Sequence, residues 1–219
     1  MQLSPLRLSL REKQLPLWLA AASLSFGIFI KITSELLEND VRGLDSSILT
    51  AVAKIRRPWL TGVAVDLTAL GSTTLVVLIS AVVLFMLLSL KDRLGAWQLL
   101  LNSVGAGMWT AISKNVIERA RPENITPLVQ VSGFSYPSGH SLASASLYLT
   151  IAILAVRYLP TTKARVLLLG LAIVVILLVC VSRVYLGVHY PSDVASGASL
   201  GVAWALLLAG GFSMIERHV

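Results

Sequence analysis

Residues 166–182 read VLLLGLAIVVILLVCVS, which is 17 consecutive positions without a charged side chain. A helix that crosses the hydrocarbon core of a bilayer needs about 17–25 predominantly apolar residues. Five further charge-free runs accompany this one, at 15–30, 67–90, 94–113, 141–156 and 194–215. These runs lack the alternation that the strands of a membrane barrel require. The sequence therefore predicts an all-α, polytopic membrane protein with six transmembrane helices.

The overall composition agrees with this fold class and excludes others. The chain has 219 residues, of which 56% are hydrophobic and 13% are charged, and its mean hydropathy is +0.80. A soluble domain carries about 25% charged residues, and a disordered chain is far less hydrophobic. The length suits a single domain over residues 1–219. The net charge of +7 is scattered between apolar runs, which fits lipid headgroups or a phosphate substrate and argues against nucleic acid as a partner.

The segment at residues 41–58, between the first two runs, has a different pattern. Apolar residues recur at helical spacing there, while Asp45, Lys54 and Arg56 lie between them. This pattern predicts a short amphipathic helix lying on the membrane surface. A helix packed over the mouth of the bundle would show the same pattern, so the sequence leaves both arrangements open.

Polar side chains inside an apolar bundle are costly and are usually functional. Lys114 and Arg121 lie seven residues apart, which places them on one face of a helix, two turns from each other. Pro122 disfavours helix at Arg121, so the helix should end there. Two cations at the end of a span can clamp an anion, whereas Arg119 and Glu123 are expected to form a solvated rim.

A second polar segment, Pro137-Ser138-Gly139-His140, comes directly before the run at 141–156. Proline and glycine shape a tight turn, and Gly139 allows backbone N–H groups to approach a ligand closely. The helix that starts at this point favours an anion at its N-terminus. His140 adds a proton donor, so this segment is a second candidate phosphate contact.

The third polar segment contains Arg183, His189 and Asp193, between the fifth and sixth runs. A carboxylate beside an imidazole can hold Nδ1–H and leave Nε2 free as a nucleophile or base. In an up-and-down bundle of six spans, all three segments lie on the same side of the membrane. Three cations, two histidines and one carboxylate then suit phosphoryl transfer and do not suit a bound transition metal.

Together these segments resemble the signature of a known family. Their order and spacing are similar to the three-part signature of the type-2 phosphatidic acid phosphatase family, and the signature region covers residues 114–193. The six-run pattern and the size of the chain are similar to bacterial membrane lipid phosphatases that act on phosphatidylglycerophosphate or undecaprenyl pyrophosphate. The matching residues are Lys114-x6-Arg121-Pro122, Pro137-Ser138-Gly139-His140 and Ser182-Arg183-x5-His189-x3-Asp193.

The resemblance implies a role for each of these residues. His189 would attack phosphorus and form a phosphohistidine, Asp193 would orient His189, and His140 would protonate the leaving group. No metal and no cofactor are implied. The residues implied to bind the phosphoryl oxygens are Lys114, Arg121, Arg183, Ser138 and Gly139.

Orientation and reaction type are less strongly indicated by the sequence. Nine basic residues fall on each side of the predicted membrane, and setting aside three site candidates leaves nine against six. The excess predicts cytoplasmic termini in a bacterial inner membrane, with the site facing the periplasm or exterior. The expected substrate is a lipid phosphate monoester or pyrophosphate in the bilayer. A lipid-to-lipid phosphotransferase or a lipid A phosphatase would use the same residues, and a non-enzymatic lipid transporter is a remote alternative.

Overall fold

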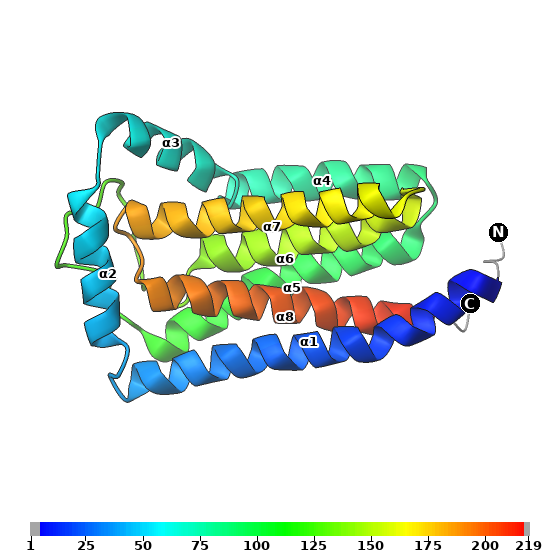
Figure 1. The fold of residues 1–219 in the computed structure, drawn as a ribbon, viewed down its shortest axis with the longest axis horizontal. Coiled ribbons are helices and arrows are strands. Elements are labelled where there is room, and N and C mark those ends of the chain that lie inside the picture. The colour runs from blue at the N-terminus through cyan, green and yellow to red at the C-terminus, as the bar shows by residue number, and fades with distance from the viewer. Residues whose placement is uncertain (1–4, 217–219) are drawn as a thin grey trace.

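The computed structural model describes residues 5–216, and side chains from residue 15 onward; this part of the chain is helical and contains no strand. Long helices run side by side along one axis, and a short helix crosses one end of them (Figure 1). The helices are α1 (Pro5–Leu37), α2 (Arg42–Lys54), α3 (Pro58–Ala69), α4 (Thr73–Ser89), α5 (Arg93–Ile117), α6 (Gly139–Ala155), the 3-10 turn η1 (Val156–Tyr158), α7 (Thr162–Tyr185) and α8 (Pro191–Ile215).

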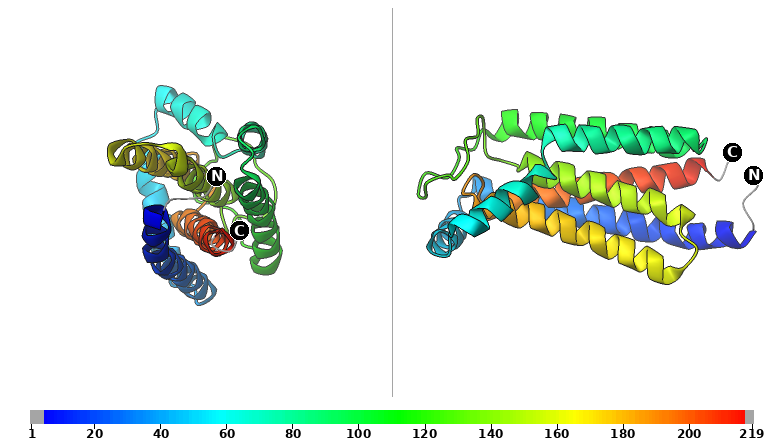
Figure 2. Two further views of the ribbon diagram at one scale, coloured as in Figure 1. Left: turned by 90° about the vertical axis from the view of Figure 1, so that its right-hand side faces the viewer. Right: turned by 90° about the horizontal axis from the view of Figure 1, so that it is seen from above.

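Helix α6 lies at the centre of the contacts that hold the bundle together. It packs against α4, α5, α7 and α8, whereas α1 packs along α8, and Figure 2 shows the same lengthwise packing from two other directions. Close approach of α6 and α8 depends on Gly197 and Gly201. A Cβ at Gly197 would lie 2.5 Å from the Ser138 carbonyl oxygen, and one at Gly201 would lie 2.4 Å from that of Leu142. Only glycine allows the two backbones to meet this closely.

Four described helices are long and apolar enough to cross a membrane: Leu15–Leu37, Gly139–Tyr158, Thr162–Tyr185 and Pro191–Ile215. The charge-free run at 67–90 does not form one straight helix, because α3 and α4 meet at an angle of 45°. This bent pair brings the number of candidate spans to five when it is counted as one. Helix α5 is long enough, but Gln98 and Asn102 reduce its hydropathy. Both side chains are completely buried within the bundle.

Helix α2 forms where the sequence predicts a short amphipathic helix. It packs against α7 and α8 and lies across the end of the bundle (Figure 1), as in the second of the two arrangements that the sequence left open. Its residue Asp45 is only 1% exposed. The sequence made no prediction for the position of this side chain, and in the structure its carboxylate is directed into the protein.

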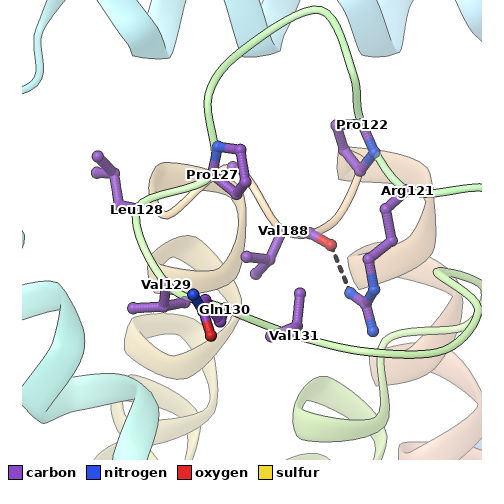
Figure 3. Close-up of a pocket in the computed structure, with 9 residues that line it drawn as sticks. Arg121, Pro122, Pro127, Leu128, Val129, Gln130, Val131 and Val188 are labelled. Atoms are coloured by element: carbon purple, nitrogen blue, oxygen red, sulfur yellow. Dashed lines mark hydrogen bonds between the residues drawn. The ribbon is translucent and has the colours of Figure 1, made fainter.

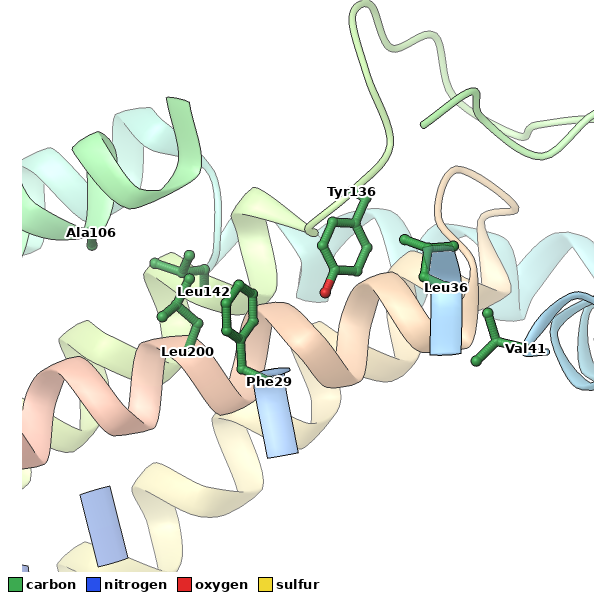
Figure 4. Packing of buried hydrophobic residues seen from close by; sticks show 7 residues of the cluster. All are labelled: Phe29, Leu36, Val41, Ala106, Tyr136, Leu142 and Leu200. Atoms are coloured by element: carbon green, nitrogen blue, oxygen red, sulfur yellow. The ribbon is translucent and has the colours of Figure 1, made fainter. Parts of the chain in front are cut away.

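A cluster of apolar side chains packs beneath this end of the bundle. Phe29, Leu36, Tyr136 and Leu142 are all buried there, together with Leu200 on α8 (Figure 4). The Tyr136 hydroxyl lies 2.7 Å from Thr33 Oγ1 of α1 and accepts a hydrogen bond from Ser196 of α8. These polar contacts fix the loop that leads into α6, and with it the position of the residues that follow.

Candidate active site

The three polar segments come together at the end of the bundle that carries α2, opposite the start of α1 and the end of α8 (Figure 1). Lys114 is in the last turn of α5, His140 in the first turn of α6, and Arg183 in the last turn of α7. Asp193 is in the first turn of α8, and His189 lies in the connection before it. Four helix ends and two connections therefore supply the site.

His189 and Asp193 form a buried pair. His189 is 2% exposed and Asp193 is 0% exposed, and 3.5 Å separates His189 Nδ1 from Asp193 Oδ2. The same Oδ2 accepts hydrogen bonds from Ser135 Oγ at 2.5 Å and from the Tyr190 backbone N–H at 2.9 Å. With these donors in place the carboxylate cannot rotate freely, and it faces Nδ1 of the imidazole.

The other ring nitrogen of His189 faces Arg121. Arg121 Nη1 lies 3.4 Å from His189 Nε2 and donates a hydrogen bond to the Val188 carbonyl oxygen at 2.7 Å. A guanidinium can only donate, so Nε2 is the acceptor and the proton of the neutral ring is on Nδ1, toward Asp193. Burial lowers the pKa of His189 to about 4, although Asp193 opposes this shift. The imidazole is therefore neutral near pH 7, with its Nε2 lone pair directed toward cationic groups.

The remaining predicted cations lie around the same point. The ammonium of Lys114 donates a hydrogen bond to the Phe134 carbonyl oxygen, and Arg121 donates to the carbonyl oxygens of three consecutive residues, 132–134. His140 interacts electrostatically with Arg183, with His189 and with both of these cations. All six ionisable residues singled out in the sequence thus fall within one cluster.

Arg183 has an unused donor in this cluster. The residue is 3% exposed, and its Nη1 donates to Thr68 Oγ1 at 2.8 Å. Its Nε atom is buried and has no hydrogen-bond partner among the described residues. A buried donor left without a partner costs about 1–3 kcal/mol, and an anion bound beside it would supply the missing acceptor.

Ser138 and Gly139 shape the start of α6. The Ser138 hydroxyl is fully buried and accepts hydrogen bonds from the backbone and side chain of Ser141, so it caps the helix. The Ser138 backbone N–H donates to the Asp193 carbonyl oxygen at 3.0 Å. The N-terminus of α6 is thereby held against the first turn of α8, and the helix dipole favours negative charge there.

The structure also brings two residues into the site that the sequence did not predict to be there. The sequence predicted that Arg119 lies at a solvated rim. This prediction is wrong, because the Arg119 side chain is only 11% exposed. Arg119 Nη1 contacts Asp193 Oδ1 at 2.5 Å and Nη2 contacts Asp45 Oδ2 at 2.7 Å. Ser135, which bonds to Asp193, was also missed. Their only signal in the sequence is the proximity of Arg119 and Ser135 to the first two motifs.

A cavity of about 440 Å³ opens beside Arg121. Figure 3 shows the Arg121 guanidinium at one side of this cavity, bonded to the Val188 carbonyl, with Pro127 and Val129 across from it. A phosphate ester held at the cations would have room for its polar group on this side. Among residues 15–216, no three His, Cys, Asp or Glu side chains are grouped so that they could hold a metal ion.

Comparisons with known proteins point to one family. Residues 95–216 match the family model described as the PAP2 superfamily. The chain is 36% identical to phosphatidylglycerophosphatase B of Bacillus subtilis (strain 168) over 197 residues, which cover 88% of this chain and 95% of that protein. It is 37% identical to the undecaprenyl-diphosphatase of Sulfolobus acidocaldarius over 103 residues, or 45% of each chain.

The crystal structure of the transmembrane PAP2 type phosphatidylglycerolphosphate phosphatase from Bacillus subtilis has a similar fold. It superposes with a TM-score of 0.81 at 33% identity, covering 90% of this chain and 98% of that one. Sequence motifs, helical architecture and similarity over nearly the full length therefore agree. The resemblance noted in the sequence is confirmed, and the chain is an integral membrane protein that belongs to the PAP2 superfamily.

Proposed function

We propose that this protein is a metal-independent lipid phosphatase that works through a phosphohistidine. The observation that carries the proposal is the His189–Asp193 pair, whose free Nε2 faces a group of cations. A binding protein needs the cations but has no use for a buried imidazole oriented by a carboxylate. Lys114, Arg121 and Arg183 hold the phosphoryl oxygens, and the N-terminus of α6 adds backbone donors at Gly139.

In the first step, the Nε2 lone pair of His189 attacks phosphorus and the bond from phosphorus to the leaving oxygen breaks. Asp193 stabilises the positive charge that develops on the imidazole, because Nδ1–H faces its Oδ2. The negative charge of bound phosphate favours the protonated form of His140, which gives its proton to the departing oxygen. The cations balance the charge on the phosphoryl group throughout.

In the second step, His140 takes a proton from water as the water oxygen attacks phosphorus. The bond between phosphorus and Nε2 breaks, inorganic phosphate forms, and neutral His189 is restored. Each histidine thus returns to its starting state. General acid–base assistance of this kind contributes about 10²–10⁴ in rate, and loss of the nucleophile removes the covalent route altogether.

The substrate is a lipid carrying a phosphate monoester or pyrophosphate, with phosphatidylglycerophosphate the first candidate. Support comes from the relatives named above, one of which is a phosphatidylglycerophosphatase and another an undecaprenyl-diphosphatase. Hydrophobic helices around the site keep the lipid tail in the bilayer while the phosphate reaches the cations.

The whole chain, residues 1–219, forms one membrane domain with six spans: α1, the bent pair α3–α4, α5, α6, α7 and α8. Helix α5 has 25 residues, about 37 Å at 1.5 Å per residue, which exceeds the roughly 30 Å hydrocarbon core. Its polar side chains Gln98 and Asn102 are buried away from lipid. The termini face the cytoplasm of a bacterial inner membrane, and the site faces the periplasm or exterior.

The test is phosphate release by the purified protein in detergent with excess EDTA. Wild type should release inorganic phosphate from dioctanoyl phosphatidylglycerophosphate or a comparable lipid phosphate, and His189→Ala should reduce the rate to background. His140→Ala should reduce it by about 10²–10⁴. Analysis of the products separates hydrolysis from transfer to a second lipid. Full activity in His189→Ala would show that the nucleophile is wrongly assigned.

A further inference from the structure

Arg119 forms an ion pair with the buried carboxylate of Asp193, on the oxygen that His189 does not face. Its Nη1 lies 2.5 Å from Asp193 Oδ1, whereas the His189 ring faces the other oxygen, Oδ2. The two oxygens thus have separate partners, and the Arg119 contact decides which way the carboxylate plane is turned. Asp193 itself is completely buried, so bulk solvent does not reach these positions.

Arg119 in turn is shared with a second carboxylate, Asp45 of α2. Arg119 Nη2 lies 2.7 Å from Asp45 Oδ2, and Asp45 also accepts hydrogen bonds from the backbone and hydroxyl of Ser192 at 3.0 and 2.5 Å. The guanidinium stacks 3.9 Å from the ring centroid of Tyr190. These contacts tie Arg119 to the protein, and it meets Asp193 at the oxygen that does not face His189.

We propose that Arg119 and Asp45 form a positioning and charge-balancing relay behind Asp193, which sets the negative potential that the His189 imidazole experiences. The inference deepens the proposed function and rests on it, because that potential matters for catalysis when His189 becomes a cationic phosphohistidine. Neither residue touches substrate, so both act through Asp193 and are positioning residues.

The sign of each residue's effect follows from Coulomb's law. Removing the positive charge of Arg119 leaves Asp193 unopposed, which favours protonation of His189. Removing the negative charge of Asp45 leaves Arg119 to oppose Asp193 alone, which disfavours protonation of His189. The two neutralising substitutions thus act in opposite directions, whereas two substitutions that merely loosened the fold would act in the same direction.

The other charged groups around His189 are unchanged in this comparison. One of them is an acid, Asp193 of α8. The others are basic residues: Lys114 of α5, Arg121 of the following loop, His140 of α6 and Arg183 of α7. Because the basic groups already disfavour an imidazolium, the balance between Arg119 and Asp45 decides how much of the Asp193 charge remains to offset them.

The decisive measurement is the titration midpoint of His189 in the full-length protein in detergent micelles. The chain contains three histidines, so selective ¹³C labelling at Cε1 gives few resonances, and His189→Gln identifies the one of interest. Arg119→Gln should raise the midpoint by about one pH unit, and Asp45→Asn should lower it. Arg119→Lys retains the charge and should restore a midpoint close to that of wild type.

Matched surface substitutions control for net charge. Lys54→Gln on α2 removes a positive charge and Asp40→Asn removes a negative charge, and both side chains are exposed. Neither should shift the midpoint measurably. If Arg119→Gln and Asp45→Asn leave it unchanged, or move it in the same direction while the spectra remain those of a folded protein, the relay does not exist.

Activity gives the second readout and separates the two proposals. With dioctanoyl phosphatidylglycerophosphate, Asp45→Asn should lower kcat by up to about tenfold, the equivalent of one pKa unit, with KM unchanged. A rise in KM at constant kcat would contradict a role in the chemical step. If wild type releases no phosphate from any lipid but the midpoints shift as expected, the proposed function fails and the charge relay stands.

Discussion

At the scale of single residues, the site depends on groups whose charge is controlled by burial. His189 is 2% exposed, and its pKa is lowered to about 4 mainly because burial disfavours the charged ring. The proposed nucleophile is therefore neutral near pH 7 and needs no base to deprotonate it. Arg183 shows the complementary arrangement, since it is a permanent cation held inside the protein with one donor unused.

The lowered pKa of His189 predicts how stability depends on pH. Its pKa in the folded protein is about 4 against an ordinary value of 6.5, so between these values only the unfolded chain takes up the proton. The free energy of unfolding should therefore fall as the pH decreases from about 6.5 to 4, by about 3 kcal/mol. Thermal unfolding in detergent should show a weaker dependence for His189→Gln. An identical dependence in both proteins would contradict the burial effect.

The free donor of Arg183 predicts a defect in phosphate binding. Arg183→Lys keeps the positive charge but loses the guanidinium fork, in which Nη1 donates to Thr68 and Nε is unused. Inhibition by inorganic phosphate should weaken by about 1.5–3 kcal/mol, the usual range for a hydrogen bond to a charged group. Thr68→Val removes only the support for Nη1 and should have a smaller effect. Equal effects of the two substitutions would show that the Nε donor is not used.

At the scale of elements, the crossing of α6 and α8 connects the fold to the site. The same backbone contact that requires Gly197 places Ser138 against the first turn of α8. The first turns of α6 and α8 carry His140 and Asp193, and the loop before α8 carries His189. Spacing between these two helices therefore controls the distance between the proposed acid and the proposed nucleophile.

Gly201 offers a test of this close packing. A Cβ at Gly201 would lie 2.4 Å from the Leu142 carbonyl oxygen, whereas one at Gly107 of α5 would meet nothing within 4 Å. Gly201→Ala should lower the free energy of unfolding by about 1–3 kcal/mol and reduce phosphate release. Gly107→Ala should leave both unchanged or stabilise the helix slightly. Loss of stability in Gly107→Ala alone would contradict the packing argument.

At the scale of the whole molecule, the bundle has two chemically different ends. Asp92, Arg157 and Glu216 form ion pairs at the end where α8 finishes, while the opposite end holds α2, the connection from α5 to α6 and the proposed site (Figure 1). In the proposed arrangement of six spans, these two ends would face opposite sides of the membrane. Substrate at the site would therefore be drawn from one leaflet.

This arrangement predicts the accessibility of introduced cysteines in a Cys180→Ser background. Gln130→Cys lies beside the cavity at the site end, and Ser89→Cys ends α4 at the other. A membrane-impermeant thiol reagent added to intact cells should label the first and not the second until the membrane is opened. Labelling of both positions in intact cells, or of Ser89→Cys alone, would contradict the proposed orientation or the number of spans.

Much of the fold was predictable because the bilayer imposes simple rules on sequence. The runs at 166–182 and 194–215 lie within α7 and α8, and the run at 141–156 coincides with α6 up to Ala155. The break between α3 and α4 was not predicted, because it falls inside a run with no charge. At this break, Gly71 packs closely against a neighbouring helix. A Cβ at Gly71 would lie 2.7 Å from Val179 Cγ1 on another helix, a contact that the sequence does not reveal.

The sequence by itself determined the helical membrane fold, the family and the set of chemical groups, because apolar runs and three spaced motifs are properties of the linear chain. Only the tertiary structure decided that Arg119 and Asp45 belong behind Asp193, since residues 74 positions apart pair there. Nothing in the pattern around either residue signals the other. A buried charge needs a partner in space, and which partner it finds depends on how the helices pack.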